Sequence, residues 1–290
     1  MRALLLILIA FAVQGAGQIR NDFERNMNKP IEPFKIVDNI YYVGASDVAV
    51  YLITTEKGHI ILDAGFAETV PMVEANVKKL GFELSDVKIL LNNHAHSDHA
   101  GGLALLKEKS GAKLYAPKKQ AKQLRRGGKQ DFAWGDKLDF APVEVDKRVR
   151  RDDKIRLGDV TINAMFTPGH TKGCTTYTTT ANHGDERYQV AFVCSISALD
   201  YNLIDNKNYG SIRKDFEETF SVLRSLKVDV FLASHGVFFK LKEKLEAWKE
   251  DPETNPFVDR VGYRKFVTRM EAAFKKKLAA QKETKPNIKR

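Results

Sequence analysis

The sequence has few of the residues that cross-link small proteins, and it has no long apolar stretch. Its 290 residues include only two cysteines, Cys174 and Cys194, and its longest apolar run, Ala3 to Val13, is too short to cross a bilayer comfortably. It also lacks a low-complexity linker and a strong short repeat. A hydrophobic content of 43% with 29% charged residues is typical of a soluble globule, which excludes a disordered or fibrous chain.

The first residues are typical of an export signal. Arg2 precedes the apolar run, and small residues follow it at Gly15, Ala16 and Gly17. A charged start, a short apolar middle and a small-residue end predict a signal peptide over residues 1–17. We therefore expect one domain over residues 18–290, in the periplasm or outside the cell, with no stable membrane anchor after cleavage.

Positive charge is concentrated at the C-terminus. The net charge is +10, and residues 275–290 contain seven basic residues against one acid, Glu283. A basic tail can bind nucleic acid, but export removes most such partners. We expect a solvated basic helix end from about residue 275 that fades into disorder, and no nucleic-acid partner.

Strand and helix patterns alternate along the chain. Strands are predicted at 51–55, 59–65, 87–93, 112–116, 160–170, 188–195 and 228–235, and helices at 70–80, from 103, at 212–223 and at 263–274. Three of these strands lead to histidines: the segment 94–99, His170 and His235. Ligands at strand ends can converge at one edge of an α/β core. The other two histidines, His59 and His183, are interpreted as surface residues.

The segment HAHSDH concentrates side chains that can bind a metal. It places His94, His96, Asp98 and His99 within six residues, a pattern with a low risk of arising by chance. In an extended segment His94 and His96 share a face and can bind one ion, while Asp98 and His99 can face a second. Imidazole and carboxylate ligands suit zinc best, with iron or manganese as alternatives. Two sites with three protein ligands each leave positions open for water, as in catalytic sites.

Several motifs together resemble the metallo-β-lactamase superfamily, and in particular the third subclass of class B β-lactamases. They are HAHSDH, TPGHTKGCTTYT (167–178), FLASH (231–235), GASDVAVYLI (44–53), CSIS (194–197) and NPFVD (255–259). The resemblance implies a four-layer αβ/βα sandwich, with two mixed β-sheets face to face and helices outside. It also implies two zinc ions, the first held by His94, His96 and His170 and the second by Asp98, His99 and His235.

The resemblance further implies hydrolysis of the β-lactam amide bond of penicillins, cephalosporins and carbapenems, which confers antibiotic resistance. Asp98 would orient a metal-bound hydroxide that attacks the lactam carbonyl, without a covalent acyl-enzyme. Ser195 and Ser197 would bind the substrate carboxylate, directly or through water. The loop Leu124–Trp134 would flank the site. A monomer with a small-molecule substrate is expected.

The residue at position 194 helps to distinguish between the candidate functions. Many other hydrolases of the superfamily place a metal-bridging aspartate near this strand end, whereas FVCSIS is followed by no acid until Asp200. We therefore disfavour, but retain, a di-zinc hydrolase of another ester, thioester or lactone. A non-catalytic metal- or nucleic-acid-binding protein is the alternative from another class. Cys194 is interpreted as a buried thiol rather than the partner of Cys174 in a disulfide, although export makes that bond possible.

Overall fold

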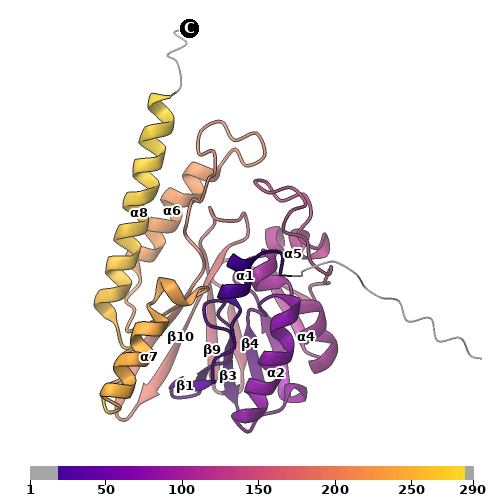
Figure 1. The fold of residues 1–290 in the computed structure, drawn as a ribbon, viewed down its shortest axis with the longest axis vertical. Coiled ribbons are helices and arrows are strands. Elements are labelled where there is room, and N and C mark those ends of the chain that lie inside the picture. The colour runs from indigo at the N-terminus through magenta and orange to yellow at the C-terminus, as the bar shows by residue number, and fades with distance from the viewer. Residues whose placement is uncertain (1–18, 285–290) are drawn as a thin grey trace, which may run out of the picture.

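The computed structural model describes residues 19–284, so the predicted signal peptide lies outside the described residues. Two β-sheets pack face to face, and helices cover both outer faces (Figure 1). This is the predicted four-layer αβ/βα sandwich. No helix among the described residues is both long enough and apolar enough to span a membrane.

The first sheet has seven strands in sequence order. Its first four strands pair antiparallel and the remaining pairs are parallel; they are β1 (Phe34–Val37), β2 (Ile40–Tyr42), β3 (Tyr51–Thr55), β4 (Gly58–Leu62), β5 (Val87–Leu91), β6 (Lys113–Pro117) and β7 (Lys147–Val149). Its outer face packs against α2 (Val70–Lys79), α4 (Leu103–Ser110) and α5 (Lys118–Arg125). The apolar positions of these helices recur every three to four residues, so one stripe of each faces the sheet.

The second sheet has five strands in the order β12-β11-β10-β9-β8. They are β8 (Lys154–Leu157), β9 (Val160–Phe166), β10 (Thr175–His183), β11 (Glu186–Val193) and β12 (Val230–Ala233), and only the pair of β11 and β12 is parallel. Its outer face packs against α6 (Ile212–Ser225) and α8 (Arg260–Glu283), with α7 (Leu241–Glu250) alongside (Figure 1). A short helix, α1 (Asp22–Met27), lies above the sheet edges.

Aromatic side chains fill the space between the sheets. The ring of Tyr51 lies 4.9 Å from that of Phe192, and its hydroxyl donates to the carbonyl of Ala233, at 2.6 Å. Because Tyr51 is fully buried, this hydrogen bond satisfies a polar group that would otherwise be costly to bury. It also fixes β12 against β3, and β12 leads to His235.

The site histidines lie just beyond the strand ends rather than on the strands. The strand predicted to reach His170 ends at Phe166, because Pro168 and Gly169 turn the chain away from the sheet. Gly169 has φ +137°, a conformation that side-chain-bearing residues rarely adopt, and a Cβ there would meet the ring of Phe216 at 2.7 Å. The turn thus packs directly on α6 and directs His170 to the sheet edge.

One expectation about a polar residue is wrong, and the expectation for the basic C-terminal helix is incomplete: Lys275, Lys276 and Lys282 are exposed as expected, but other residues of the helix pack. His59, expected at the surface, is only 9% exposed, because its ring packs edge-on against Phe82 with centroids 5.0 Å apart. The basic C-terminal helix is not simply solvated. Leu278 is buried, and Gln281 accepts a hydrogen bond from the amide of Leu203 and donates one to the carbonyl of Tyr201. Residues 285–290, the end of the basic tail, lie outside the described residues.

Candidate metal centre

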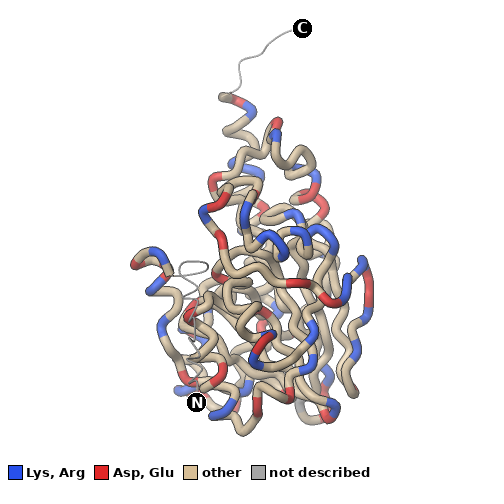
Figure 2. The backbone as a smooth tube through the Cα atoms, turned by 90° about the vertical axis from the view of Figure 1, so that its right-hand side faces the viewer, with Lys and Arg blue, Asp and Glu red and all other residues tan. Residues whose placement is uncertain are grey.

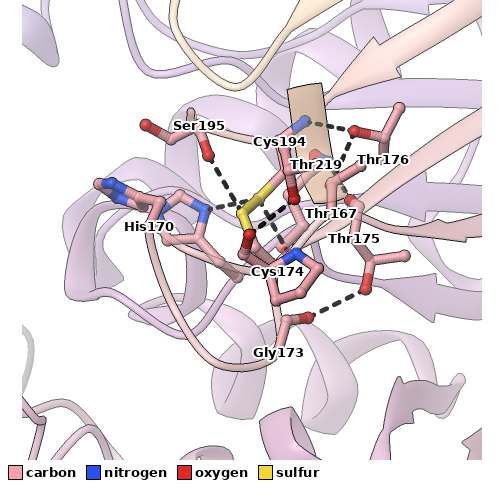
Figure 3. Close-up of a disulfide and its surroundings, with 12 residues drawn as sticks. Thr167, His170, Gly173, Cys174, Thr175, Thr176, Cys194, Ser195 and Thr219 are labelled. Atoms are coloured by element: carbon pink, nitrogen blue, oxygen red, sulfur yellow. Dashed lines mark hydrogen bonds between the residues drawn. A yellow bond between two sulfur atoms is a disulfide. The ribbon is translucent and has the colours of Figure 1, made fainter. Parts of the chain in front are cut away.

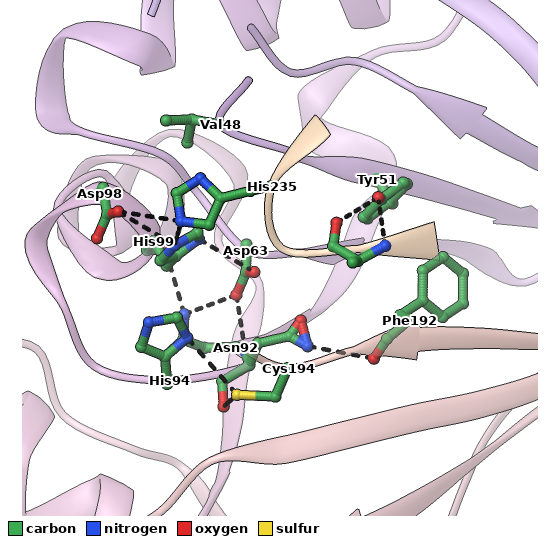
Figure 4. A network of polar contacts seen from close by, with 12 residues as sticks. Val48, Tyr51, Asp63, Asn92, His94, Asp98, His99, Phe192, Cys194 and His235 are labelled. Atoms are coloured by element: carbon green, nitrogen blue, oxygen red, sulfur yellow. Dashed lines mark hydrogen bonds and ion pairs between the residues drawn. The ribbon is translucent and has the colours of Figure 1, made fainter. Parts of the chain in front are cut away.

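The fold brings all six predicted metal ligands to one edge of the two sheets. Figure 4 shows four of them, His94, Asp98, His99 and His235. The segment after β5 supplies His94, His96, Asp98 and His99, the last two on the short helix α3 (Ser97–Ala100). His170 follows β9, and His235 follows β12. The neighbouring imidazole rings have centroids 4.3 to 4.9 Å apart. Such crowding of bases is unfavourable in a packed core and is typical of a metal site.

The first group of three has the spacing of a metal site. Ligand atoms of His94, His96 and His170 all lie within 4.8 Å of one another, and the three side chains are buried. The nitrogen of His170 that does not face this group is fixed, since its Nδ1 donates to the carbonyl of Ser197 at 2.9 Å. That hydrogen bond leaves the Nε2 lone pair of His170 available to a cation.

The second group lies beside the first. Nε2 of His99 is 3.1 Å from Nε2 of His235 and 3.3 Å from a carboxylate oxygen of Asp98. The same oxygen lies 3.5 Å from Nε2 of His235. Two imidazole nitrogens and one carboxylate oxygen therefore converge on one point, which is a nitrogen and oxygen donor set that suits zinc.

Carboxylates stand behind the second group. Nδ1 of His235 donates to Asp47 at 2.9 Å, and Nδ1 of His99 lies 3.6 Å from Asp63. Asp63 is itself held by hydrogen bonds from the side chain of Asn92 (2.8 Å) and the amide of Asn93 (2.7 Å) (Figure 4). A carboxylate behind a histidine orients the ring and strengthens it as a ligand.

A third carboxylate comes from the segment predicted to flank the site. This segment begins as the end of α5 and continues as a loop, in which Asp131 lies 3.8 Å from Nε2 of His96. Both side chains are almost fully buried. Sequence reasoning missed Asp47, Asp63 and Asp131 as parts of the site. The only signal was their occurrence in the motifs GASDVAVYLI, ILDAG and GGKQDF, none of which is specific alone.

The two cysteines form a disulfide, so the interpretation of Cys194 as a buried thiol is wrong (Figure 3). Tyr177 and Phe192 are partners in the β10–β11 ladder, a register that places Thr175 opposite Cys194. Cys174 lies one residue before β10 begins, and its Cα is 6.0 Å from that of Cys194. The hairpin of β10 and β11 brings the two residues close, which their linear spacing of 20 residues does not reveal. Its Sγ on Cys194 lies 3.6 Å from Nδ1 of His94 and can only accept a hydrogen bond there.

Burial and charge fix the protonation of the histidines. Burial, and then the neighbouring histidines, hold the pKa of His94 well below its ordinary value, and burial lowers that of His170 to about 3. Burial acts the same way on His99, but Asp98 and Asp63 outweigh it and raise its pKa to about 10. His94 and His170 therefore carry free lone pairs at neutral pH, whereas a cation must displace a proton from His99.

The sheet edge that carries these six side chains opens into a cavity of about 400 Å³. Ser195 and Ser197 both line it, with hydroxyl oxygens 3.2 Å apart, as do Asp98, His96, His170 and His235. The remaining wall is largely apolar and comes from α1, the flanking loop, the segment after β11 and the turn after His235. Its residues are Phe23, Met27, Phe66, Trp134, Leu138, Leu199, Val237 and Phe238.

A family model and solved structures match this chain closely. Residues 43–235 match the model of the Metallo-beta-lactamase superfamily. The native FEZ-1 metallo-beta-lactamase from Legionella gormanii is 38% identical, with a TM-score of 0.87 over 89% of this chain and 99% of that chain. BJP-1, a subclass B3 metallo-beta-lactamase of Bradyrhizobium japonicum, is 36% identical, with a TM-score of 0.82 over 89% and 97%.

A third structure differs at the site itself. A Cronobacter sakazakii enzyme described by its HARLDQ motif is 40% identical, with a TM-score of 0.86 over 90% of this chain and 99% of that chain. The present chain has HAHSDH, so His96 and His99 are residues for which that motif has arginine and glutamine. The present chain thus offers two more imidazole ligands.

Curated relatives match shorter segments. A Burkholderia pseudomallei protein named "Probable metallo-hydrolase" is 31% identical over 157 residues, which is 53% of this chain and 50% of that protein. A hydroxyacylglutathione hydrolase from Rhodopseudomonas palustris is 30% identical over 104 residues, which is 36% of this chain and 32% of that protein. The chain therefore spans a third to a half of the length of these relatives.

Proposed function

The chain belongs to the metallo-beta-lactamase superfamily, and we propose that it is a di-zinc hydrolase of the β-lactam amide bond, acting on penicillins, cephalosporins and carbapenems. One combined observation carries the proposal. Six nitrogen and oxygen donors converge in this chain, and its fold overlays almost the whole of a metallo-beta-lactamase. The hydrolase class follows from the family, and the β-lactam substrate is the proposed part.

The donor set fits two zinc ions. The first would be held by His94, His96 and His170, and the second by Asp98, His99 and His235. When bound, such ions lower the pKa of a coordinated water to about 7 and polarise a carbonyl oxygen. Both groups have three protein donors, which leaves room for water and substrate.

Side chains that line the cavity carry out the remaining steps. Asp98 lines it and accepts a hydrogen bond from the attacking water, which it orients toward the lactam carbonyl carbon. Water adds to this carbon, the C–N bond of the ring breaks, and the nitrogen takes up a proton. The hydroxyls of Ser195 and Ser197 donate to the carboxylate of the drug and so hold the ring over the donors.

The apolar wall accommodates the substituents of the drug. Among the described residues, four large hydrophobic side chains are exposed, and three of them, Phe23, Leu199 and Val237, line this one cavity. Exposed apolar groups concentrated around a polar floor are typical of a ligand site.

We further propose that the protein acts outside the cytoplasm and confers resistance to β-lactams there. The signal-like residues 1–17 support export. The disulfide between Cys174 and Cys194 supports an oxidising compartment, since such bonds are rare in the cytosol.

A thioester hydrolase is the second candidate, because hydroxyacylglutathione hydrolases are among the relatives. Two observations disfavour it. The match covers only 32% of such an enzyme, and the strand end at residues 194–197 has no acid that could bridge two metals.

The test is hydrolysis of a carbapenem by the zinc-loaded protein of residues 18–290, followed by absorbance with and without EDTA. S-lactoylglutathione serves as the competing substrate. Rapid, chelator-sensitive opening of the carbapenem is expected, with turnover lost in His96→Ala and kept in the matched His59→Gln variant, whose histidine lies far from the donors. Two bound zinc ions with thioester turnover alone would overturn the β-lactam proposal.

A further inference from the structure

A second cavity, of about 240 Å³, lies behind the first metal group. Ala95, between the two metal-binding histidines of its motif, lines this hollow, as do Thr171 and Gly173, which follow His170. Asp131 also lines it, whereas Trp134 of the same loop lines the metal cavity. The loop thus lies between the two cavities. The second cavity, called the hollow below, has no role in the proposed hydrolysis.

Four cations surround the hollow. Lys119, Lys122 and Arg126 lie three and then four residues apart, so α5 and the residue that ends it present them on one stripe. Lys172, on the turn after His170, provides the fourth. Within residues 19–284 none of the four forms an ion pair, although positive and negative residues are interspersed over much of the surface seen from the side of α5 (Figure 2).

Lys172 lines the hollow, and two groups outside this lining contact its ammonium group. Its Nζ donates to the carbonyl of Asn208 at 2.5 Å and lies 5.2 Å from the ring centre of Tyr209. Lys119, Lys122 and Arg126 line the same hollow, and so does the carboxylate-bearing Asp131. The cations therefore repel one another across the hollow, and a bound anion would relieve this repulsion.

The wall of the hollow contains a fixed hydrogen-bond acceptor. Gln120 is 2% exposed, and its Nε2 donates to the carbonyl and to the side-chain oxygen of Asn92. Both partners are acceptors, because the amide nitrogen of Asn92 already donates to Asp63 and to the carbonyl of His99. The orientation of the Gln120 amide is thereby determined, and its Oε1 has no partner.

Thr171 adds a second unpartnered group. It is 8% exposed, lines the hollow, and its hydroxyl has no hydrogen-bond partner. Buried polar atoms without partners are rare and costly, so two in one wall indicate a missing ligand.

We propose that this hollow binds a phosphate group carrying two negative charges, either inorganic phosphate or a small phosphate monoester. Lys119, Lys122, Arg126 and Lys172 surround its oxygens, and the Thr171 hydroxyl donates to one of them. For hydrogen phosphate, the protonated oxygen donates to Oε1 of Gln120, a hydrogen bond that sulfate has no proton to make.

The test is equilibrium dialysis of radiolabelled inorganic phosphate, and of glycerol 3-phosphate, against the zinc-loaded protein at low ionic strength. The hollow variant is Lys119→Gln/Lys122→Gln. Its matched control, Lys57→Gln/Lys78→Gln, loses the same charge from two exposed lysines that line neither cavity. His96→Ala reports any phosphate bound at the metal ions.

We expect saturable binding of one equivalent of at least one of the two probes. Affinity should fall by at least about tenfold in the hollow variant, since each lost charge contributes about 1 kcal/mol or more at close range. It should be unchanged in the control and retained in His96→Ala, and sulfate should compete poorly. Binding that depends on His96 and not on the two lysines, or no saturable binding of either probe, would overturn the proposal.

Discussion

Nδ1 of His235 lies 2.9 Å from a carboxylate oxygen of Asp47, although 188 positions separate the two residues. The other oxygen of Asp47 accepts the amide of Val237 at 2.7 Å. One partly buried carboxylate therefore orients the imidazole and also holds the turn that follows it. This arrangement points Nε2 of His235 at Asp98 and His99, which is the direction that metal binding requires.

Replacing this carboxylate should weaken the second metal position. We expect Asp47→Asn to bind one of its zinc equivalents about 10- to 100-fold more weakly, because an amide orients the ring less well and makes it a poorer ligand. Titration against a chromophoric zinc chelator measures this loss. Asp185→Asn, at an exposed hairpin turn, is the control. Two equivalents bound as tightly as in the wild type would contradict the role given to Asp47.

Asp98 should matter more for turnover than for folding. We expect Asp98→Ala to lower kcat by at least about 100-fold, the usual range for losing a positioned proton-accepting group. Its circular dichroism should remain that of the wild type, because Asp98 belongs to a short helix at the cavity and packs in no hydrophobic cluster. Turnover near the wild-type rate in the zinc-loaded variant would exclude Asp98 from the reaction.

The sequence predicts the six donor residues well because each lies either in one short segment or just after a strand. HAHSDH is contiguous, and His170 and His235 each follow a recognisable strand, so the sheet edge brings them together. The supporting carboxylates are different. Asp47 reaches His235 and Asp131 reaches His96 only because of sheet order and loop path. No periodicity in one segment contains this information.

The same reasoning explains the errors. The disulfide depends on how the hairpin brings the residue before β10 to the residue after β11, and the contacts of Gln281 follow from how far α8 extends along the second sheet. From composition alone, residues 275–290 are predicted to form a charged, solvated end of the chain. The lysines at 275, 276 and 282 are indeed exposed, but a glutamine amide and a buried leucine show that the helical part also packs against the fold.

The disulfide should stabilise the fold. It joins residues separated by 20 positions, and a loop of this size corresponds to about 3 kcal/mol in the chain-entropy model. We expect Cys174→Ser/Cys194→Ser to lose a free energy of unfolding of this order in urea, and the wild type to fall to the same level in reductant. Equal stability of the oxidised wild type and the double variant would show that the bond contributes nothing.

The apolar wall should govern affinity rather than chemistry. Val237 is 67% exposed and lines the metal cavity, whereas Val261 is 53% exposed and does not. We expect Val237→Ala to raise KM a few-fold for a cephalosporin with an aromatic substituent, because about two methylene-sized groups of contact are lost. kcat should be unchanged, and Val261→Ala should change neither constant. An equal effect of the two substitutions would indicate a general loss of stability.

Asp229 should make stability depend on pH in the acid range. It accepts the amide of Gln189 at 2.7 Å and Nε of Arg260 at 2.5 Å, and so ties β11 to the start of α8. Burial acts against its charge, but these two donors outweigh burial and lower the pKa of Asp229. A lowered pKa means that the folded state holds the proton less tightly than the unfolded state does. The stabilisation is therefore complete above pH about 4, the ordinary pKa of aspartate, and is lost as the pH falls through the lower folded value.

Comparison with Asp229→Asn isolates this effect. At pH 7 we expect the variant to be less stable by about 1 kcal/mol, the size of a partly exposed charged hydrogen bond. Urea denaturation from pH 7 to pH 3 should show the two free energies of unfolding converging as the pH falls below about 4. Because the side-chain amide of the variant does not titrate, a constant difference across this range would mean that the wild-type carboxylate contributes through its shape and not through its charge.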